Sequence, residues 1–178
     1  MRLLVLIGTV LLGALAAGPT WAAPMDAAPE LGKVGKRAAP LGYQLYCLKN
    51  KEQCKGGGAQ QVRHSGQLLG KLKRVNSSVN SSMRFKSDKT DIWGKGSDCE
   101  DYALAKRKLL IREGVSPSAL RMAVVRNSKG QGHAVLIVKT DRGEMVLDSA
   151  RKTILPRQET GYTFLAVATS NPRTWSKF

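Results

Sequence analysis

GKGSDCEDYALAKRKLLIREG, residues 94–114, places one thiol among three carboxylates at the start of a predicted helix. Asp98 is a favourable N-cap, and Glu100 and Asp101 fall in the first turn, where negative side chains stabilise the exposed amides. The glycine that ends the stretch is a natural helix stop. The pattern therefore predicts a helix that carries Cys99 at its beginning.

Helical periodicity precedes this stretch and strand periodicity follows it. An apolar face recurs at spacings of three and four residues at Leu68, Leu72, Val75, Val79 and Met83. Four β-rich segments come later: RMAVVR (121–126), HAVLIVKT (133–140), EMVLDS (144–149) and GYTFLAVA (161–168). The middle two are joined by DRG and predict a β-hairpin. Helices followed by an antiparallel sheet indicate the α+β class.

The N-terminus resembles an export signal. MRLLVLIGTVLLGALAAGPTWAAP has a positive Arg2, then an apolar run and small residues, which fits a signal peptide over residues 1–22. An uncleaved anchor is the alternative. Either reading predicts a periplasmic or secreted protein. Residues 23–64, rich in Ala, Pro, Gly and Lys, are predicted to form a flexible arm, and residues 65–178 one domain.

The chain has three cysteines, an odd number for an exported protein. Cys47 and Cys54 lie close together in YCLKNKEQC and are predicted to close a disulfide loop in the arm. Cys99 is then left as a free thiol. A different pairing, or three reduced cysteines, remain open.

The formal net charge is +16, or +15 without Arg2. This charge favours anionic partners. Export argues against nucleic acid, and aromatic and basic residues do not alternate as in single-strand binders. An anionic contact in the cell envelope, or solubility alone, remains as an explanation.

The predicted hairpin brings a histidine and a carboxylate to one face of the sheet. If its turn centres on residues 141–142, Val135 lies opposite Asp148 and His133 is the diagonal neighbour. Diagonal Cβ atoms lie roughly 7–8 Å apart, within reach of a side-chain hydrogen bond. A register shift of one residue would destroy this arrangement.

Cys99, His133 and Asp148 are the parts of a cysteine nucleophile. A helix N-terminus and a nearby imidazolium favour a thiolate, the histidine moves the proton, and the carboxylate fixes the histidine's tautomer. Each residue alone has an ordinary explanation: a small core residue, a structural histidine or a turn-closing acid. Asn80 and Trp93 are weaker candidates for donors to an oxyanion.

Several motifs add a family resemblance. SDCEDYALAKRKLLIREGVSPSALRMAVV, followed by GHAVLIV and MVLD, resembles the bacterial transglutaminase-like cysteine proteinases. The resemblance covers about residues 68–175. It implies that Cys99 is the nucleophile, His133 the general acid and base, and Asp148 the orienting carboxylate. The implied fold is the papain/transglutaminase core, with the cysteine's helix packed on an antiparallel sheet.

The acids around Cys99 require a balancing charge, because three carboxylates would raise the pKa of the thiol. A hard, oxygen-seeking cation suits such ligands, and the resemblance implies calcium. Asp98, Glu100 and Asp101 are therefore candidate Ca²⁺ ligands. N-capping without any metal is the alternative. A zinc site is not expected, because such a site needs clustered Cys and His, and the chain has only His64 and His133 and no close cysteine pair.

The sequence thus predicts an exported cysteine endopeptidase that cleaves a protein of the cell envelope or surface, with possible calcium dependence. Transglutamination or glutamine deamidation by the same triad is the first alternative. A non-catalytic binding module of the envelope is the second.

Overall fold

The computed structural model describes residues 35–87 and 92–177, which all belong to the unit Lys33–Phe178. The predicted signal peptide lies outside the described residues. The helices are α1 (Leu41–Lys49), α2 (Gly66–Ser82) and α3 (Cys99–Arg112). The strands are β1 (Lys36–Arg37), β2 (Leu120–Arg126), β3 (Gly132–Thr140), β4 (Gly143–Leu147), β5 (Leu155–Pro156), β6 (Thr163–Ala168) and β7 (Trp175–Lys177). In this part of the chain, no helix combines the length and apolar character needed to cross a membrane.

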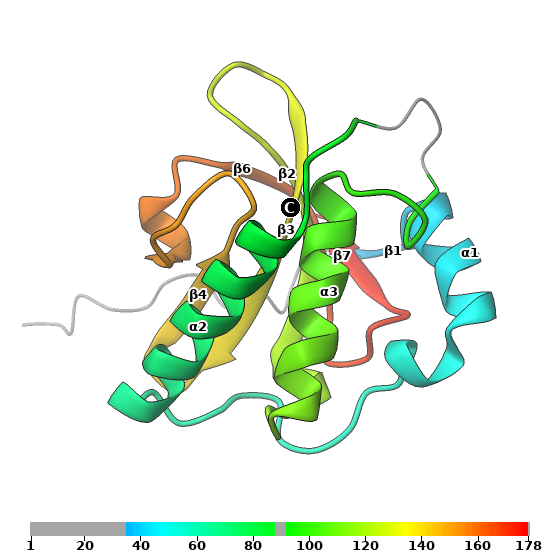
Figure 1. Cartoon of the computed structure of the whole chain (residues 1–178). Coiled ribbons are helices and arrows are strands. Elements are labelled where there is room, and N and C mark those ends of the chain that lie inside the picture. The colour runs from blue at the N-terminus through cyan, green and yellow to red at the C-terminus, as the bar shows by residue number, and fades with distance from the viewer. Residues whose placement is uncertain (1–34, 88–91, 178) are drawn as a thin grey trace, which may run out of the picture. The chain divides into compact units, whose positions relative to one another are not determined.

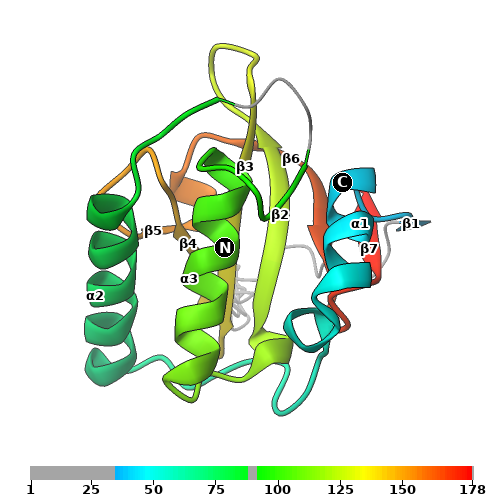
Figure 2. The ribbon, with the colours of Figure 1, turned by 45° about the vertical axis from the view of Figure 1, so that its right-hand side comes forward.

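The strands form one seven-stranded antiparallel sheet in the order β1-β7-β6-β2-β3-β4-β5. Helices α2 and α3 run side by side in opposite directions on one face of this sheet, and α1 lies beyond α3 on the same face (Figures 1 and 2). The predicted α+β class is confirmed.

The core lies between the helices and the sheet. Apolar residues of α2 and α3, including Leu72 and Leu110, pack with Leu136 and Leu147 of the sheet, and all four are fully buried. Strand β3 is buried along Ala134–Val138, which explains its unbroken apolar sequence. Burial of each such leucine stabilises the fold by about 1.5–3 kcal/mol.

The helix boundaries follow local chemistry. Ser65 caps α2, because its hydroxyl accepts a 3.1 Å hydrogen bond from the amide of Leu68. Gly114 ends α3 with a φ of +82°, a left-handed conformation that glycine adopts without strain. Helix α3 begins at Cys99 directly after Asp98, as the sequence predicts.

The segment 41–54 differs from the predicted flexible arm. It forms α1 and a short 3₁₀ turn, η1 (Lys51–Cys54), and Tyr43 of α1 is 1% exposed. The Tyr43 ring contacts Trp93 and Trp175 edge-on, with centroids 5.3 and 5.4 Å away. The helix escaped prediction because its exposed leucines place apolar residues on both faces and blur the periodicity. The exposed residues are Leu41, Leu45 and Leu48.

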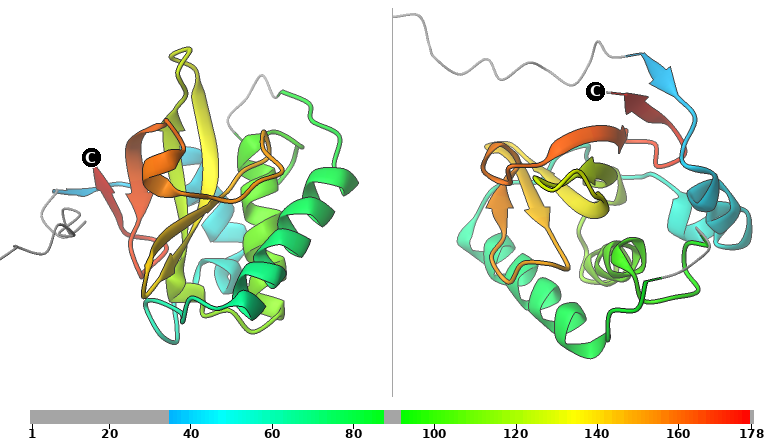
Figure 3. Two further views of the ribbon diagram at one scale, coloured as in Figure 1. Left: turned by 90° about the vertical axis from the view of Figure 1, so that its left-hand side faces the viewer. Right: turned by 90° about the horizontal axis from the view of Figure 1, so that it is seen from above.

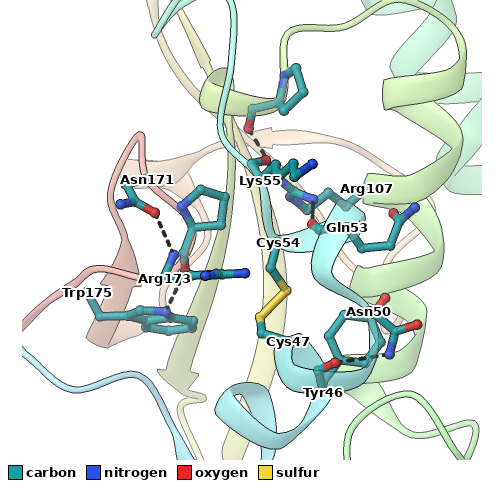
Figure 4. Close-up of a disulfide and its surroundings, with 12 residues drawn as sticks. Tyr46, Cys47, Asn50, Gln53, Cys54, Lys55, Arg107, Asn171, Arg173 and Trp175 are labelled. Atoms are coloured by element: carbon teal, nitrogen blue, oxygen red, sulfur yellow. Dashed lines mark hydrogen bonds between the residues drawn. A yellow bond between two sulfur atoms is a disulfide. The ribbon is translucent and has the colours of Figure 1, made fainter.

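A disulfide joins Cys47 of α1 to Cys54 of η1, as predicted (Figure 4). The buried guanidinium of Arg107, on α3, binds the chain on both sides of Cys54, where it donates to the carbonyls of Gln53 and Lys55. Two further bonds of Arg107 reach the carbonyls of Pro117 and Leu120 at 3.4 Å. One side chain therefore ties the bridged segment to the middle of α3.

Candidate active site

Helix α3 and the β2–β3 hairpin meet where α3 begins (Figure 3). This end of α3 carries Cys99, whose side chain is partly buried. The sulfur lies beside strand β3, where the backbone N–H of Ala134 donates a hydrogen bond to it. Because Ala134 directly follows His133, the start of α3 lies beside the part of β3 that carries His133.

The hairpin register brings His133 to Asp148. Leu136 pairs with Leu147, so the next opposed positions are Val135 and Asp148, as the sequence predicts. The imidazole Nε2 lies 2.7 Å from Oδ1 of Asp148. Two of the three predicted residues, His133 and Asp148, are therefore hydrogen-bonded to each other, and Cys99 lies beside the strand that carries His133.

Asp148 is held by several donors. Its side chain is 3% exposed, and its Oδ1 also accepts a 2.9 Å bond from the amide of Ala150. Its Oδ2 accepts a 2.6 Å bond from the hydroxyl of Tyr162. Burial alone would raise the pKa of Asp148, but the bonds from His133 and Tyr162 outweigh burial and hold the pKa below its usual value. Asp148 is thus an ionised acceptor.

The ionised acceptor defines the role of each imidazole nitrogen. A carboxylate only accepts, so Nε2 of His133 carries the hydrogen that it donates to Asp148. Nδ1 is then the nitrogen that can accept a proton from a thiol. The ring of Tyr162 packs edge-on against the imidazole at a centroid distance of 5.7 Å and restricts its rotation.

Tyr162 is a site residue that sequence reasoning missed. It directly precedes β6, 14 residues after Asp148, and lies close to Asp148 because the chain turns back after β5. The only sequence feature that pointed to this role was a tyrosine directly before an apolar strand, and such tyrosines are common in antiparallel sheets.

The environment of Cys99 suppresses the thiolate. Burial and the neighbouring Glu100 raise the pKa of Cys99 to about 12. The thiol donates a 3.4 Å hydrogen bond to Oε2 of Glu100, and the Ala134 amide offsets only part of the shift. A proton acceptor, or a positive charge near the acids, is needed to activate this sulfur.

The acids do not act as one group. Asp98 and Glu100 are buried side by side, and burial together with a hydrogen bond that protonated Glu100 donates to Asp98 raises the pKa of Glu100 to about 7. Asp98 makes no capping bond, and its buried Oδ1 has no hydrogen-bond partner. These two side chains have the oxygen chemistry of a hard-cation site.

The hydrogen bonds of Asp101 differ from those of the other two acids. Its two oxygens accept bonds from the amides of Gly94 and Gly96, at 2.6 and 2.8 Å. It therefore holds the loop before α3. Across residues 35–87 and 92–177, no three side chains of His, Cys, Asp or Glu converge as a metal site.

The two predicted oxyanion donors are engaged elsewhere. The side-chain amide of Asn80 donates to the carbonyls of Asp148 and Arg151, at 3.0 and 3.2 Å. Trp93 is 6% exposed and packs against Tyr43 in the core. The amide of Cys99 itself lies in the first turn of α3, where backbone N–H groups have no partner within the helix.

Comparisons with known proteins give a family match and a shared fold. A family model described as bacterial transglutaminase-like cysteine proteinase matches residues 33–178. No curated protein matches the chain significantly. Calcium-bound LapG from Legionella pneumophila is similar in structure, with a TM-score of 0.55, 24% identity, and coverage of 61% of this chain and 68% of that one. EGTA-treated LapG gives a TM-score of 0.50 at 24% identity, with coverage of 56% and 62%. The chain thus spans less than two thirds of the EGTA-treated structure, and the likeness concerns the fold.

Proposed function

The chain belongs to the bacterial transglutaminase-like cysteine proteinases, and we propose that it is an exported endopeptidase that uses Cys99, His133 and Asp148 to cleave a protein of the cell envelope or surface. One observation carries the assignment of residues: the 2.7 Å bond between His133 and Asp148, next to the strand amide that binds the sulfur of Cys99. The cysteine peptidase activity follows from the family, and the triad and the substrate are the proposal.

The proposed reaction begins with proton transfer. Nδ1 of His133 takes the thiol proton, and the ionised Asp148 stabilises the resulting imidazolium through Nε2–H. The pair formed by the imidazolium and the Asp148 carboxylate favours loss of the thiol proton. It thereby offsets the neighbouring acids, which raise the pKa of Cys99. The thiolate then attacks the carbonyl carbon of the scissile peptide bond, and a thioester forms after collapse of the tetrahedral intermediate.

The remaining steps use the same groups in reverse. His133 returns its proton to the leaving amine, so that the C–N bond breaks. It then takes a proton from water, which hydrolyses the thioester and releases the thiol. The backbone N–H of Cys99 at the start of α3 is suited to stabilise the oxyanion, because the helix dipole adds positive potential there.

We propose calcium as the cation that Asp98 and Glu100 bind. Two features support it: the unpaired buried Oδ1 of Asp98, and the pair of adjacent carboxylates beside Cys99. Calcium takes six to eight oxygen ligands, so backbone carbonyls and water would complete the shell. A divalent charge there lowers the pKa of the thiol and favours its ionisation. Asp101 supports the site from the adjacent loop.

Cleavage is tested by incubation of the purified protein with envelope proteins, with calcium or with chelator, and by comparison with Cys99→Ala. We expect products from the wild type that the variant does not form. Identical product patterns would refute proteolysis. Ammonia release from glutamine peptides without cleavage would instead identify a deamidase or transglutaminase.

The non-catalytic alternative has its own test. A binding module would leave Cys99 unreactive towards an alkylating probe at neutral pH. We expect rapid, stoichiometric labelling of Cys99 in calcium. The periplasmic or secreted location, and contact with an anionic envelope surface through the net charge, are part of the same proposal.

A further inference from the structure

The segment 83–87 runs beside the start of α3. It rises from the end of α2, at the end of the molecule where α3 begins (Figures 1 and 2). Lys86 and Ser97 form an antiparallel β-bridge, in which the amide of Lys86 donates a 3.1 Å hydrogen bond to the carbonyl of Ser97. Ser97 precedes Cys99 by two residues, so the bridge lies at most about 7 Å along the chain from the proposed nucleophile.

Two further hydrogen bonds fix the backbone of the segment 83–87. The carbonyl of Arg84 accepts a 2.6 Å bond from the hydroxyl of Ser97, and the carbonyl of Met83 accepts a 2.7 Å bond from the hydroxyl of Tyr102 on α3. All three bonds use backbone groups of the segment. The side chains of Arg84, Phe85 and Lys86 take no part in them and are exposed to solvent.

Phe85 is an unusual residue to expose on a fixed segment. Its exposed fraction is 61%, which leaves in water an apolar area that folding could otherwise bury. Arg84 and Lys86 flank it in the chain. Phenylalanine and arginine are enriched in surfaces that bind proteins. The segment therefore has the composition of a binding surface, and it lies beside the residues that would act on a peptide bond.

The exposed charges around the proposed site are all positive in the described part of the chain. Besides Arg84 and Lys86, they come from the loop before α3, from the β2–β3 hairpin and from the loop after Asp148. They are Lys95, Arg126, Lys129 and Lys152. The acids of the same region are all buried, namely Asp98, Glu100, Asp101 and Asp148.

The exposed acids of the described residues lie in other segments, at Glu52, Glu113, Asp141 and Glu159. Glu113 follows the far end of α3, and Asp141 lies in the turn at the far end of the β3–β4 hairpin. Residues 88–91 contain one lysine and two aspartates, a net charge of −1 that does not reverse the balance. The positive charge around the site is thus not offset by exposed acids, unlike that at the opposite end of α3.

A surface of one charge sign attracts a chain of the opposite sign and speeds their association. An acidic polypeptide fits this surface, because the cations and Phe85 lie around the residues proposed to cleave a peptide bond. An anionic lipid surface fits less well, because it would need the cations but not their position around Cys99.

We propose that the segment 83–87 determines substrate specificity: Arg84 and Lys86 bind acidic residues of the substrate, and Phe85 contacts an apolar side chain beside them. The substrate class is thus an acidic stretch of polypeptide. This inference rests on the proposed function of Cys99, His133 and Asp148, whose substrate it specifies.

The preference is measured by cleavage of a mixture of random-sequence peptides in calcium, with the new termini identified by mass spectrometry. We expect Asp and Glu to be enriched near the bond that the wild type cleaves. Arg84→Glu/Lys86→Glu should abolish this enrichment. The variant should fold normally, because the bonds that fix the segment use its backbone. Lys49→Glu/Lys51→Glu is the matched control, because it makes the same change of net charge on two exposed residues at the end of α1 and should keep the enrichment.

A kinetic comparison separates recognition of charge from a general loss of activity. One cleaved acidic peptide is compared with a counterpart in which Asn and Gln replace Asp and Glu. For the acidic peptide at low ionic strength, kcat/KM should be about fivefold lower in Arg84→Glu/Lys86→Glu than in the wild type, and salt should reduce the difference. The amide counterpart should be cleaved equally by both. Phe85→Ala should raise KM for both peptides, because an apolar contact does not depend on charge.

The outcomes distinguish this inference from the proposed function. Cleavage without a preference for acidic peptides, a preference that Arg84→Glu/Lys86→Glu leaves unchanged, or an unchanged KM in Phe85→Ala would overturn the inference and leave the peptidase intact. If the same variant keeps the preference but no longer sediments with phosphatidylglycerol vesicles, the cations bind lipid and the inference is also overturned. If wild type and Cys99→Ala leave the same peptides, the proposed function fails, and this inference fails with it.

Discussion

The hydroxyl of Tyr162 donates a 2.6 Å hydrogen bond to Oδ2 of Asp148, the oxygen opposite the one that receives His133. The two donors clamp the carboxylate from both sides and fix its plane. The same tyrosine packs against the imidazole edge-on. One residue outside the predicted triad therefore orients two of its members.

Tyr162→Phe should lower the rate of Cys99 alkylation at neutral pH by about tenfold. A hydrogen bond to a charged group contributes about 1.5–3 kcal/mol, and part of this energy orients Asp148. Circular dichroism should be unchanged. Tyr43→Phe is the matched control, because it removes a buried hydroxyl that has no partner. An equal effect of both variants would mean that the loss is structural.

Calcium should raise the melting temperature of the wild type relative to chelator. A ligand at a hundredfold excess over its dissociation constant stabilises a fold by about 2.7 kcal/mol. Asp98→Asn and Glu100→Gln should abolish the calcium-induced rise, because both remove a proposed ligand charge. Asp101→Asn should lower the melting temperature in both conditions but keep the rise. A wild type that melts identically with and without calcium would remove the metal proposal.

Stability should rise with pH between about 7.5 and 9. The fold lowers the pKa of Lys106 from 10.5 to about 7, so in this range the unfolded chain binds more protons than the folded one. The free energy of unfolding therefore increases with pH, by at most about 1.4 kcal/mol per unit. The measurement is a series of thermal melts in one ionic strength. Lys106→Met should lack the increase, and a parallel rise in that variant would assign it to other groups.

Cys47→Ser/Cys54→Ser should destabilise the fold by about 2–3 kcal/mol. The bridge joins residues seven apart and removes loop entropy from the unfolded chain. The measurement is urea unfolding with and without reductant. Reductant should destabilise the wild type and leave the double variant unchanged. A double variant as stable as the oxidised wild type would contradict this prediction.

The sequence predicted the elements with the clearest periodicity. Helix α2, helix α3 with Cys99 at its start, and the hairpin with His133 and Asp148 were each predicted from spacing and caps, and the register followed from the hairpin turn. These features depend on local chemistry and on the alternation of a strand.

Features that depend on distant contacts were not predicted. Helix α1 is held by Tyr43 between two tryptophans, and neither contact has a local pattern. Tyr162 reaches Asp148 because the chain reverses direction between them. The different contacts of the three acids depend on the loop 94–96. Its amides bind Asp101, whereas Asp98 and Glu100 lie beside the sulfur. The burial of Lys106 was also not predicted, because a lysine is rarely fully buried and the spacing in the helix does not reveal it.

The bonds of Arg107 bear on how the protein can be shortened for expression. A chain that starts at residue 65 would lose the carbonyls of Gln53 and Lys55 and leave a buried guanidinium short of acceptors. The loss would destabilise the middle of α3, the helix that carries Cys99 at its start. Versions made for assay or crystallisation should therefore begin before residue 41, so that the bridged segment remains part of the folded enzyme.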